Sequence, residues 1–388
     1  MHILMLLSNA YRPDPRVERA ATALVQGGHQ VTLLCWDRQA ELPSRESQSG
    51  IEVIRVHNVP SGYGSGWRQV LFTPRFWRQA VHLALPLSPA AVHSHDLDTL
   101  YAGWHIKKRL ACPLVYDAHE HYPALMSLYL PGILVRALTF WERYLLKQVD
   151  ATITASTVLR DEFLQLTSRP VIALGNYQDL ACYTAIPDSE IQALRARLGV
   201  APGQLLVAYI GGFSRNREIL PLIHAAQFLP DVEIHLWGDG HQKELVQSSA
   251  DLYPNVTYHG WLPHAQVPLA TKAADVIYYG LRIDYPGAIY NAPNTLTQAM
   301  AAGRPIVANE VGDLGSIIRA TKCGLLVQPL TPETIAQALI SLRDPGIRHD
   351  FGTHGFNAAQ TTYNVQASQA TLIQLYQGLF HNAPGLSR

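Results

Sequence analysis

Cysteine is scarce in this sequence, and neither sign of charge predominates. The 388 residues contain four cysteines, whose spacing suits neither a disulfide framework nor a zinc knuckle. Thirty basic residues balance thirty acidic ones, and this formal net charge of zero offers no electrostatic reason to expect nucleic acid as a partner. The scattered thiols favour a reducing, cytoplasmic location.

Long apolar runs are also missing. No uninterrupted run reaches the roughly 18 residues that a bilayer-spanning helix needs, and the nearest candidate, residues 132–141, is interrupted by Arg136. The opening residues MHILMLLS lack the basic start of a secretory signal, so we expect a buried first strand there. With 48% hydrophobic and 15% charged residues, the composition indicates a compact globular protein, either soluble or peripheral to a membrane.

Short β-branched apolar runs alternate with longer amphipathic segments in two series, which is typical of parallel sheets covered by helices. The predicted strands cover residues 3–7, 31–35, 53–56, 91–95, 114–117, 151–154 and 171–174 in the first series, and 205–210, 233–237, 256–259, 276–279, 305–308 and 324–327 in the second. We therefore predict two doubly wound, Rossmann-like α/β domains that face a cleft. The weakly periodic stretch 175–187 is the predicted linker.

The stretch PNTLTQAMAAGRP, residues 293–305, is the most informative single segment. Pro293 suits the first turn of a helix, so the amides of Asn294, Thr295 and Leu296 should point out of the positive helix end. Gly303 should end this helix, and a buried strand follows Pro305. Such a helix start predicts an anion site suited to a nucleotide diphosphate.

A second anion site is predicted where Gly211 and Gly212 follow a buried strand. The residues Ser214-Arg215-Asn216-Arg217 then lead into a helix expected over residues 218–228. Small residues allow close backbone approach, and arginines form paired hydrogen bonds with phosphate oxygens. An ordinary strand-to-helix turn with solvated arginines is the alternative interpretation. Gly238 follows the next strand, and Trp261 is expected either in a base pocket or at the edge of the core.

Polar residues follow three strands of the first series. Asp14 is expected to cap a helix that begins at Pro15, and the loop 9–14 should line the cleft. Histidines and carboxylates gather after the other two strands, and the set comprises His93, His95, Asp96, Asp98, Asp117, His119, Glu120 and His121. These side chains predict either a metal site or a site for a sugar and an acceptor. We favour the sugar and acceptor site, with His119 as its principal residue and His93 as a structural one.

The order of these segments resembles the retaining glycosyltransferases of family 4, which have the GT-B fold and transfer a sugar from a nucleotide donor. The matching pieces are DPRVERAATALVQGGHQVTLL, HSHDLDTLYAG, VYDAHEHYP, YIGGFSRNREILPLI, EIHLWGDG, YHGWLP and PNTLTQAMAAGRPIVANEVGDLGSII, which span nearly the whole chain. The resemblance implies an acceptor-binding domain over residues 1–180 and a donor-binding domain over residues 181–361. It also implies that a last helix within residues 362–388 crosses back onto the first domain.

The resemblance further assigns roles to residues. Arg217 is similar to the basic residue that contacts the donor diphosphate, and His119 to the histidine near the transferred sugar, so these two are the expected catalytic residues. The expected donor-binding residues are Gly211, Gly212, Arg215, Gly238, Trp261, Asn291, Asn294, Thr295, Leu296 and Gln298. The expected acceptor-binding residues are Arg12, His95 and Asp98. Tyr290 and Gln298 stand where the family often has two glutamates, and Gly212 where many members have an arginine.

The expected reaction is transfer of a sugar from a nucleotide diphosphate to a hydroxyl acceptor, with retention of anomeric configuration and without a metal ion or other cofactor. Three alternatives stay open. The replaced glutamates suit a non-catalytic nucleotide-sugar binder or partner subunit, and a metal-dependent hydrolase could use His93, His95, Asp98 and His119. A nucleotide-sugar epimerase is a close variant of the transferase.

Two segments, residues 63–87 and 122–146, mix aromatic residues with arginines. Such segments are able to bind a membrane surface or a lipid-linked acceptor. Helix packing with arginines that extend toward solvent is the favoured interpretation. Peripheral membrane contact is therefore the second possibility, and the oligomeric state is left open.

Overall fold

The computed structural model describes residues 1–11, 14–61 and 69–381, and it divides into two compact units. Unit 1 comprises Met1–Gly175 and Gln366–Arg388, and unit 2 comprises Asn176–Val365. Each unit contains one sheet and its own hydrophobic core. None of the described helices combines the length and apolar character needed to span a bilayer.

Unit 1 is built on an eight-stranded sheet in the order β3-β4-β2-β1-β5-β6-β7-β8. Its strands are β1 (His2–Leu7), β2 (Gln30–Trp36), β3 (Arg45–Gln48), β4 (Ile51–Val56), β5 (Ala91–His95), β6 (Leu114–Ala118), β7 (Ala151–Thr154) and β8 (Val171–Ala173). Its α-helices are α1 (Pro15–Gln26), α2 (Gln69–Ala84), α3 (Leu97–Leu110), α4 (Tyr122–Met126), α5 (Gly132–Leu146), α6 (Thr157–Leu164) and α16 (Val365–His381). All strand pairs are parallel except β3 with β4.

Unit 2 contains a parallel six-stranded sheet in the order β11-β10-β9-β12-β13-β14. Its strands are β9 (Leu205–Ile210), β10 (Val232–Trp237), β11 (Val256–Tyr258), β12 (Val276–Tyr279), β13 (Ile306–Ala308) and β14 (Gly324–Leu326). Its α-helices are α7 (Ala181–Thr184), α8 (Asp188–Arg197), α9 (Leu220–Ala225), α10 (Lys243–Ala250), α11 (Val267–Ala273), α12 (Asn294–Ala302), α13 (Gly312–Thr321), α14 (Pro332–Ser341) and α15 (Pro345–Thr361).

Every strand predicted from the sequence is present, with small shifts at its ends, and the two doubly wound α/β domains are confirmed. The predictions missed β3, whose residues Arg-Glu-Ser-Gln are mostly exposed and carry no apolar signal. This antiparallel edge strand pairs with β4 and is tied to it by an ion pair between Glu46 and the buried Arg55.

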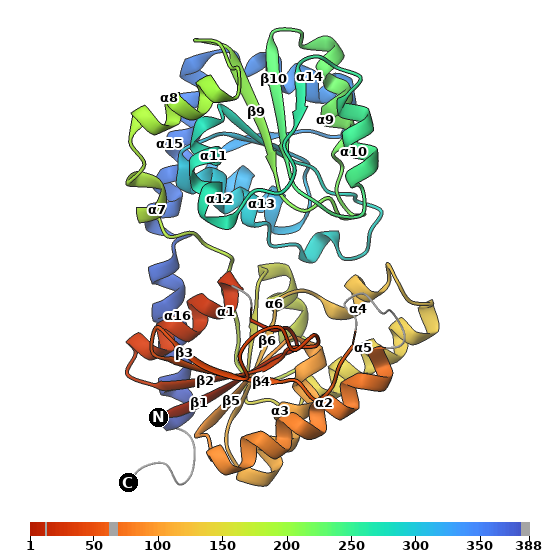
Figure 1. Cartoon of the computed structure of the whole chain (residues 1–388), viewed down its shortest axis with the longest axis vertical. Coiled ribbons are helices and arrows are strands. Elements are labelled where there is room, and N and C mark those ends of the chain that lie inside the picture. The colour runs from red at the N-terminus through yellow and green to blue at the C-terminus, as the bar shows by residue number, and fades with distance from the viewer. Residues whose placement is uncertain (12–13, 62–68, 382–388) are drawn as a thin grey trace. The chain divides into compact units, whose positions relative to one another are not determined.

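The last helix belongs to the first unit, as the resemblance implies. Helix α16 lies beside α1 (Figure 1), and its Leu372 and Tyr376 are part of the core of unit 1. The Tyr376 hydroxyl group lies 2.9 Å from Nδ1 of His93, whose side chain is completely buried. His93 therefore has the structural role expected from the sequence, because it joins the sheet to this returning helix.

Glu142 of α5 provides a test of how burial in unit 1 changes the pKa of a carboxyl group. Its side chain is buried and accepts a hydrogen bond from the Tyr116 hydroxyl at 2.8 Å, and burial raises the pKa of Glu142 from 4.5 to about 7. A carboxyl group with a raised pKa stabilises the fold below pH 4.5, and this contribution is lost as the pH rises through 7. The shift corresponds to about 3 kcal/mol.

We therefore expect Glu142→Gln to gain stability relative to the unchanged protein as the pH rises from 5 to 8. The neutral amide keeps the acceptor for Tyr116 but cannot ionise. Melting temperatures of both proteins at the two pH values check this, with Asp161→Asn as the control, because Asp161 is an exposed carboxylate of the same unit. A temperature difference that does not change with pH would contradict the prediction.

Candidate functional site

The candidate anion site of unit 2 lies where the chain connections diverge from β9. Strand β9 pairs with β10 on one side and with β12 on the other. The chain leaves β9 toward β10 and leaves β12 toward β13, which lie in opposite directions along the sheet. No neighbouring connection therefore crosses the segments that leave the ends of β9 and β12. In doubly wound sheets, ligands bind at this switch point, outside the carboxyl ends of the strands. The predicted glycines Gly211 and Gly212 directly follow β9 at this place.

The loop that follows β9 is held on both sides by backbone hydrogen bonds. Phe213 donates to the carbonyl of Asp239 at 2.8 Å, and Glu218 donates to that of Gly280 at 3.0 Å. Arg217 forms an isolated antiparallel bridge with Leu281. The loop therefore has a fixed backbone that presents the Arg217 side chain from a defined position.

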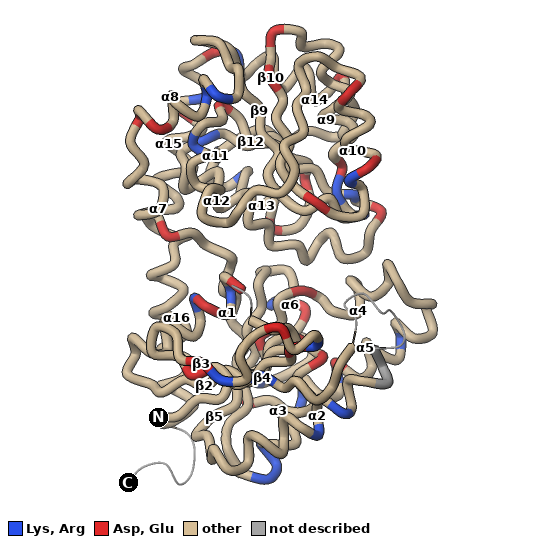
Figure 2. Tube along the Cα trace, in the orientation of Figure 1, with Lys and Arg blue, Asp and Glu red and all other residues tan. Residues whose placement is uncertain are grey.

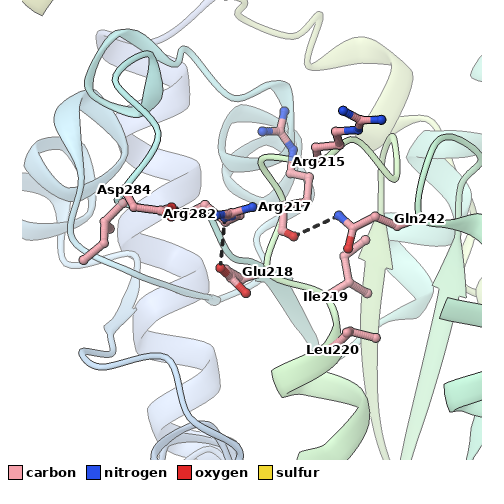
Figure 3. Close-up of a pocket in the computed structure, with 9 residues that line it drawn as sticks. Arg215, Arg217, Glu218, Ile219, Leu220, Gln242, Arg282 and Asp284 are labelled. Atoms are coloured by element: carbon pink, nitrogen blue, oxygen red, sulfur yellow. Dashed lines mark hydrogen bonds and ion pairs between the residues drawn. The ribbon is translucent and has the colours of Figure 1, made fainter. Parts of the chain in front are cut away.

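The guanidinium group of Arg217 lies 5.0 Å from the centroid of the Tyr279 ring, at the end of β12. Tyr279 in turn donates a hydrogen bond to Oδ1 of Asn291 at 3.2 Å. The guanidinium groups of Arg215 and Arg217 extend to the same side of the loop, away from Leu220 (Figure 3). Both arginines border a pocket of about 460 Å³.

Helix α12 begins beside the same strand end. It starts at Asn294, one residue later than predicted, because Pro293 is extended and serves as the N-cap; this residue provides no side-chain acceptor for the first amides. The Thr295 hydroxyl donates to the carbonyl of Ile210 at 3.3 Å, which fastens the first turn to the end of β9. The helix start is thus placed as an anion site requires, because its first amides cannot bond within the helix.

Other predicted donor residues occupy different positions. Leu296 and Gln298 are buried on α12, so Leu296 can offer a ligand only its backbone, whereas Asn294 is exposed. Trp261 is 67% exposed, which excludes the core edge as its location. Gly238 is buried, and a Cβ atom there would lie 2.0 Å from the carbonyl oxygen of Gly211, so close packing accounts for this glycine.

The helix predicted over residues 218–228 is wrong at its start. Helix α9 begins at Leu220, contains six residues and continues as a 3₁₀ turn, Ala226–Phe228. The backbone of Arg217 and Glu218 is engaged with residues 280–281, which keeps both residues out of the helix. Arg217 consequently provides positive charge through its side chain and not from a helix end.

In unit 1, Asp117 is the centre of the polar cluster. Asp117 is the penultimate residue of β6, lies beside His95 of β5 and is buried. Arg16 of α1 lies 2.6 Å from its Oδ1 atom, while His93 and His95 each lie 3.5 Å from Oδ2. His119 is 3.8 Å from Oδ2, so the cluster brings together most of the predicted rim residues.

Burial controls the protonation of this cluster. It lowers the pKa of His119 well below the usual range, despite the nearby Asp117 carboxylate, and it lowers the pKa of His93 to about 4. Burial would raise the pKa of Asp117, but Arg16 and the histidines hold it well below its usual value. The cluster therefore holds an ionised Asp117 and a neutral His119 at neutral pH.

His119 is held in place by two neighbours. Its Nε2 atom lies 2.9 Å from Nδ1 of His95, and its Nδ1 atom lies 3.4 Å from a carboxylate oxygen of Asp96. Asp96 also accepts a hydrogen bond from the His119 backbone amide and adopts a positive φ of 60°, a strained conformation for a residue with a side chain. His119 is thus fixed at the strand ends, whereas His95 is buried beneath it.

The remaining predicted acceptor residues differ in what the structure shows. Arg12 lies outside the described residues. The Oδ1 atom of Asp98 is buried and has no hydrogen-bond partner among the described residues, and burial raises the pKa of Asp98. This oxygen is therefore a candidate partner for a donor group of a ligand.

The metal interpretation needs a correction. Ligand atoms of His93, His95 and Asp117 lie within 4.8 Å of one another, so the carboxylate among the histidines is Asp117 and not Asp98. The Arg16 guanidinium group occupies one oxygen of this carboxylate and brings a positive charge next to the site. A cation would have to displace or tolerate that charge, so the donor set fits a metal ion poorly.

Family comparisons cover most of the chain. The model of the glycosyl transferase 4-like domain matches residues 13–175, and that of the glycosyl transferases group 1 matches residues 204–344. The chain belongs to the group 1 glycosyltransferases.

Named relatives of this glycosyltransferase are distant in sequence. It is 25% identical over 315 residues to a GDP-mannose-dependent alpha-mannosyltransferase of Mycolicibacterium smegmatis, which covers 80% of this chain and 79% of the relative. It is 24% identical to a D-inositol 3-phosphate glycosyltransferase of Nocardia farcinica, over 93% of this chain and 85% of the relative.

Solved structures share the GT-B fold. Sucrose-phosphate synthase of Thermosynechococcus elongatus superposes with a TM-score of 0.83 at 20% identity and covers 98% of this chain and 100% of its own. Anabaena HepE, solved in complex with UDP-glucose, superposes with a TM-score of 0.71 at 19% identity and covers 97% of this chain and 99% of its own.

Several residues of the two candidate sites were missed from the sequence. Asp117 was only one member of the rim cluster, Arg16 was not among the expected site residues, and Tyr279 was only the last residue of a predicted strand. The position of Asp117 and Tyr279 at the carboxyl ends of predicted parallel strands could have identified them. Nothing in the sequence pairs Arg16 with a carboxylate more than a hundred residues away.

Two glycines of this loop region allow a matched test. We expect Gly238→Ala to destabilise unit 2 by about 1 to 3 kcal/mol, because the added Cβ would strike the Gly211 carbonyl oxygen. Gly212→Ala is the control, since a Cβ at that position would find its nearest neighbour 4.0 Å away. Thermal unfolding of both variants checks the difference, and equal stability of the two would contradict the packing described.

Proposed function

We propose that this glycosyltransferase binds a nucleotide-diphosphate sugar on unit 2 and transfers the sugar to a hydroxyl of an acceptor bound by unit 1. The observation that carries the proposal is the placement of Arg217 and the α12 start at the switch point between β9 and β12. Cationic and amide donors at one sheet edge are suited to the phosphates of such a donor. The names of the relatives support the same donor class.

The proposed reaction breaks the bond between the anomeric carbon and the donor phosphate oxygen. A new bond forms between that carbon and the acceptor oxygen, and the acceptor proton is taken up by the departing diphosphate. Negative charge grows on the diphosphate, where Arg217 and the first amides of α12 would stabilise it. One such donor typically contributes about 3 kcal/mol to the transition state.

Retention of configuration is part of the proposal. A front-face attack, with the diphosphate accepting the proton, needs no covalent nucleophile on the protein. His119 would contact the transferred sugar as a neutral imidazole, which its lowered pKa supports. A neutral ring can donate or accept a hydrogen bond to a sugar hydroxyl without competing for the phosphate charge.

We further propose that Gln298 contacts the donor ribose with its amide, in the second turn of α12. An amide can both donate to and accept from a hydroxyl, although such bonds are weaker than those of a carboxylate. We also infer that no metal ion is required, because Arg215, Arg217 and the helix start supply positive charge; activity retained in a chelator would support this. Peripheral membrane contact and a cytoplasmic location stay predictions.

The diphosphate contact is tested by substitution. We expect Arg217→Ala to weaken binding of UDP or GDP about 10- to 100-fold, as loss of a charge-assisted hydrogen bond typically does. Isothermal titration calorimetry with each nucleotide gives the dissociation constants. The control is Arg282→Gln, because Arg282 borders the same pocket but forms an ion pair with the exposed Asp284. Equal affinity of Arg217→Ala and the unchanged protein would refute the proposed role.

The stereochemical outcome has its own test. A thermal-shift screen with UDP-, GDP-, ADP- and TDP-sugars first identifies the donor through ligand-linked stabilisation. Proton NMR of the first product formed from an α-linked donor then reports the anomeric configuration, and we expect an α-linkage. A β-linked first product would show inversion, and formation of an altered nucleotide sugar without acceptor would indicate an epimerase.

A further inference from the structure

A second pocket lies in unit 1 and is lined mainly by residues of three helices. Helices α2, α3 and α5 lie together (Figure 1), and the pocket between them measures about 610 Å³. Three aromatic rings form a continuous wall, with Trp77 4.6 Å from Tyr101 and Tyr101 5.4 Å from Trp141, measured between ring centroids. Such a wall suits an apolar or amphiphilic ligand.

Cationic side chains border this aromatic wall. Arg78 of α2 and Arg109 of α3 line the pocket and are exposed, and within the described part of the chain neither lies in an ion pair. Lys and Arg positions recur along the three helices (Figure 2). Helix α2 contains no acidic residue, and the one acidic residue of α5, Glu142, is buried. The chain is neutral as a whole, so this basic face is a local feature.

The exposed side of α5 extends the same chemistry beyond the pocket. Ile133 and Phe140 are 72% and 73% exposed, and Arg136 and Arg143 are exposed beside them. All exposed residues of α5 are apolar, aromatic or cationic. This combination binds molecules that carry both a hydrocarbon part and negative charge.

The pocket is also connected to a predicted acceptor residue. The indole nitrogen of Trp77 donates a hydrogen bond of 2.5 Å to the carbonyl oxygen of Asp98. Asp98 lies in the first turn of α3, which follows His95 at the end of β5. A molecule bound against Trp77 therefore lies next to the backbone of the candidate acceptor site within the same unit.

We propose that this pocket binds an amphiphilic acceptor that carries a phosphate-class anion on a hydrocarbon chain. The hydrocarbon part packs on the aromatic wall, and Arg78 and Arg109 bind the anion. An uncharged apolar ligand would leave both guanidinium groups unused, and a small free anion would leave the rings uncovered. This inference rests on the proposed function for the identity of the acceptor, but binding at the pocket is measurable without transfer.

Dodecyl phosphate below its micellar concentration is the probe. Calorimetric titration and quenching of tryptophan fluorescence should show saturable binding, and the double substitution Arg78→Gln with Arg109→Gln should weaken it at least tenfold. Arg160→Gln is the control, because Arg160 is exposed on α6 and pairs with its neighbour Asp161. Melting temperatures verify that the variants are folded, and a Trp141→Leu variant tests the aromatic wall independently.

Other occupants give different results. Equal binding of dodecyl maltoside, or binding of inorganic phosphate with the same affinity as the alkyl phosphate, would overturn the proposal. The proposal would also be overturned if the protein bound vesicles of anionic lipid but not monomeric dodecyl phosphate. That result would show that this face binds a membrane surface. Nucleotide binding by the double variant should be unchanged, so failure of this proposal and failure of the donor site are distinguished.

Discussion

The pairing of β9 with β12 is the constraint on which the candidate donor site depends. These neighbouring strands send their following segments in different directions, and the space at their carboxyl ends stays available for backbone amides and side chains. The loop after β9 is fixed by hydrogen bonds to residues that follow β10 and β12, and α12 is fastened to Ile210 by Thr295. The positive groups are therefore already oriented before a ligand binds, which reduces the cost of ordering them.

The strands were predictable because burial on both faces of a parallel sheet demands continuous apolar runs. The ends of α12 were also predictable, the start to within one residue of Pro293 and the end at Gly303, through the backbone preferences of these two residues. The start of α9 was not, because the bridge between Arg217 and Leu281 is a contact between distant segments that no local propensity contains. The edge strand β3 was missed because an exposed polar strand has no hydrophobic period.

The sequence predicted where the candidate site of unit 1 lies, but it did not predict which side chains of the site pair with one another. Parallel strand ends bring His95, Asp117 and His119 to one edge of the sheet, which the order of the segments predicts. The ion pair of Asp117 with Arg16 joins strand β6 to α1 and depends on the tertiary fold. Tyr376 contributes from a helix almost three hundred residues away in sequence from its partner His93. Burial and the charge of Arg16 set the protonation of the cluster, and both depend on the tertiary fold, so residue types alone could not separate a metal site from a sugar site.

Arg16 and Arg217 differ in burial, and this difference distinguishes a structural arginine from one that can bind a ligand. Arg16 is almost buried and bonds both the Asp117 carboxylate and the carbonyl of Leu174, so its charge is neutralised inside the fold. Arg217 is half-buried at a strand end, lies over the Tyr279 ring and borders a pocket. A buried ion pair tends to fix local structure, whereas a positioned cation at a pocket edge can still exchange water for a phosphate. The same side-chain chemistry thus fixes Asp117 in unit 1 and remains available for the proposed donor in unit 2.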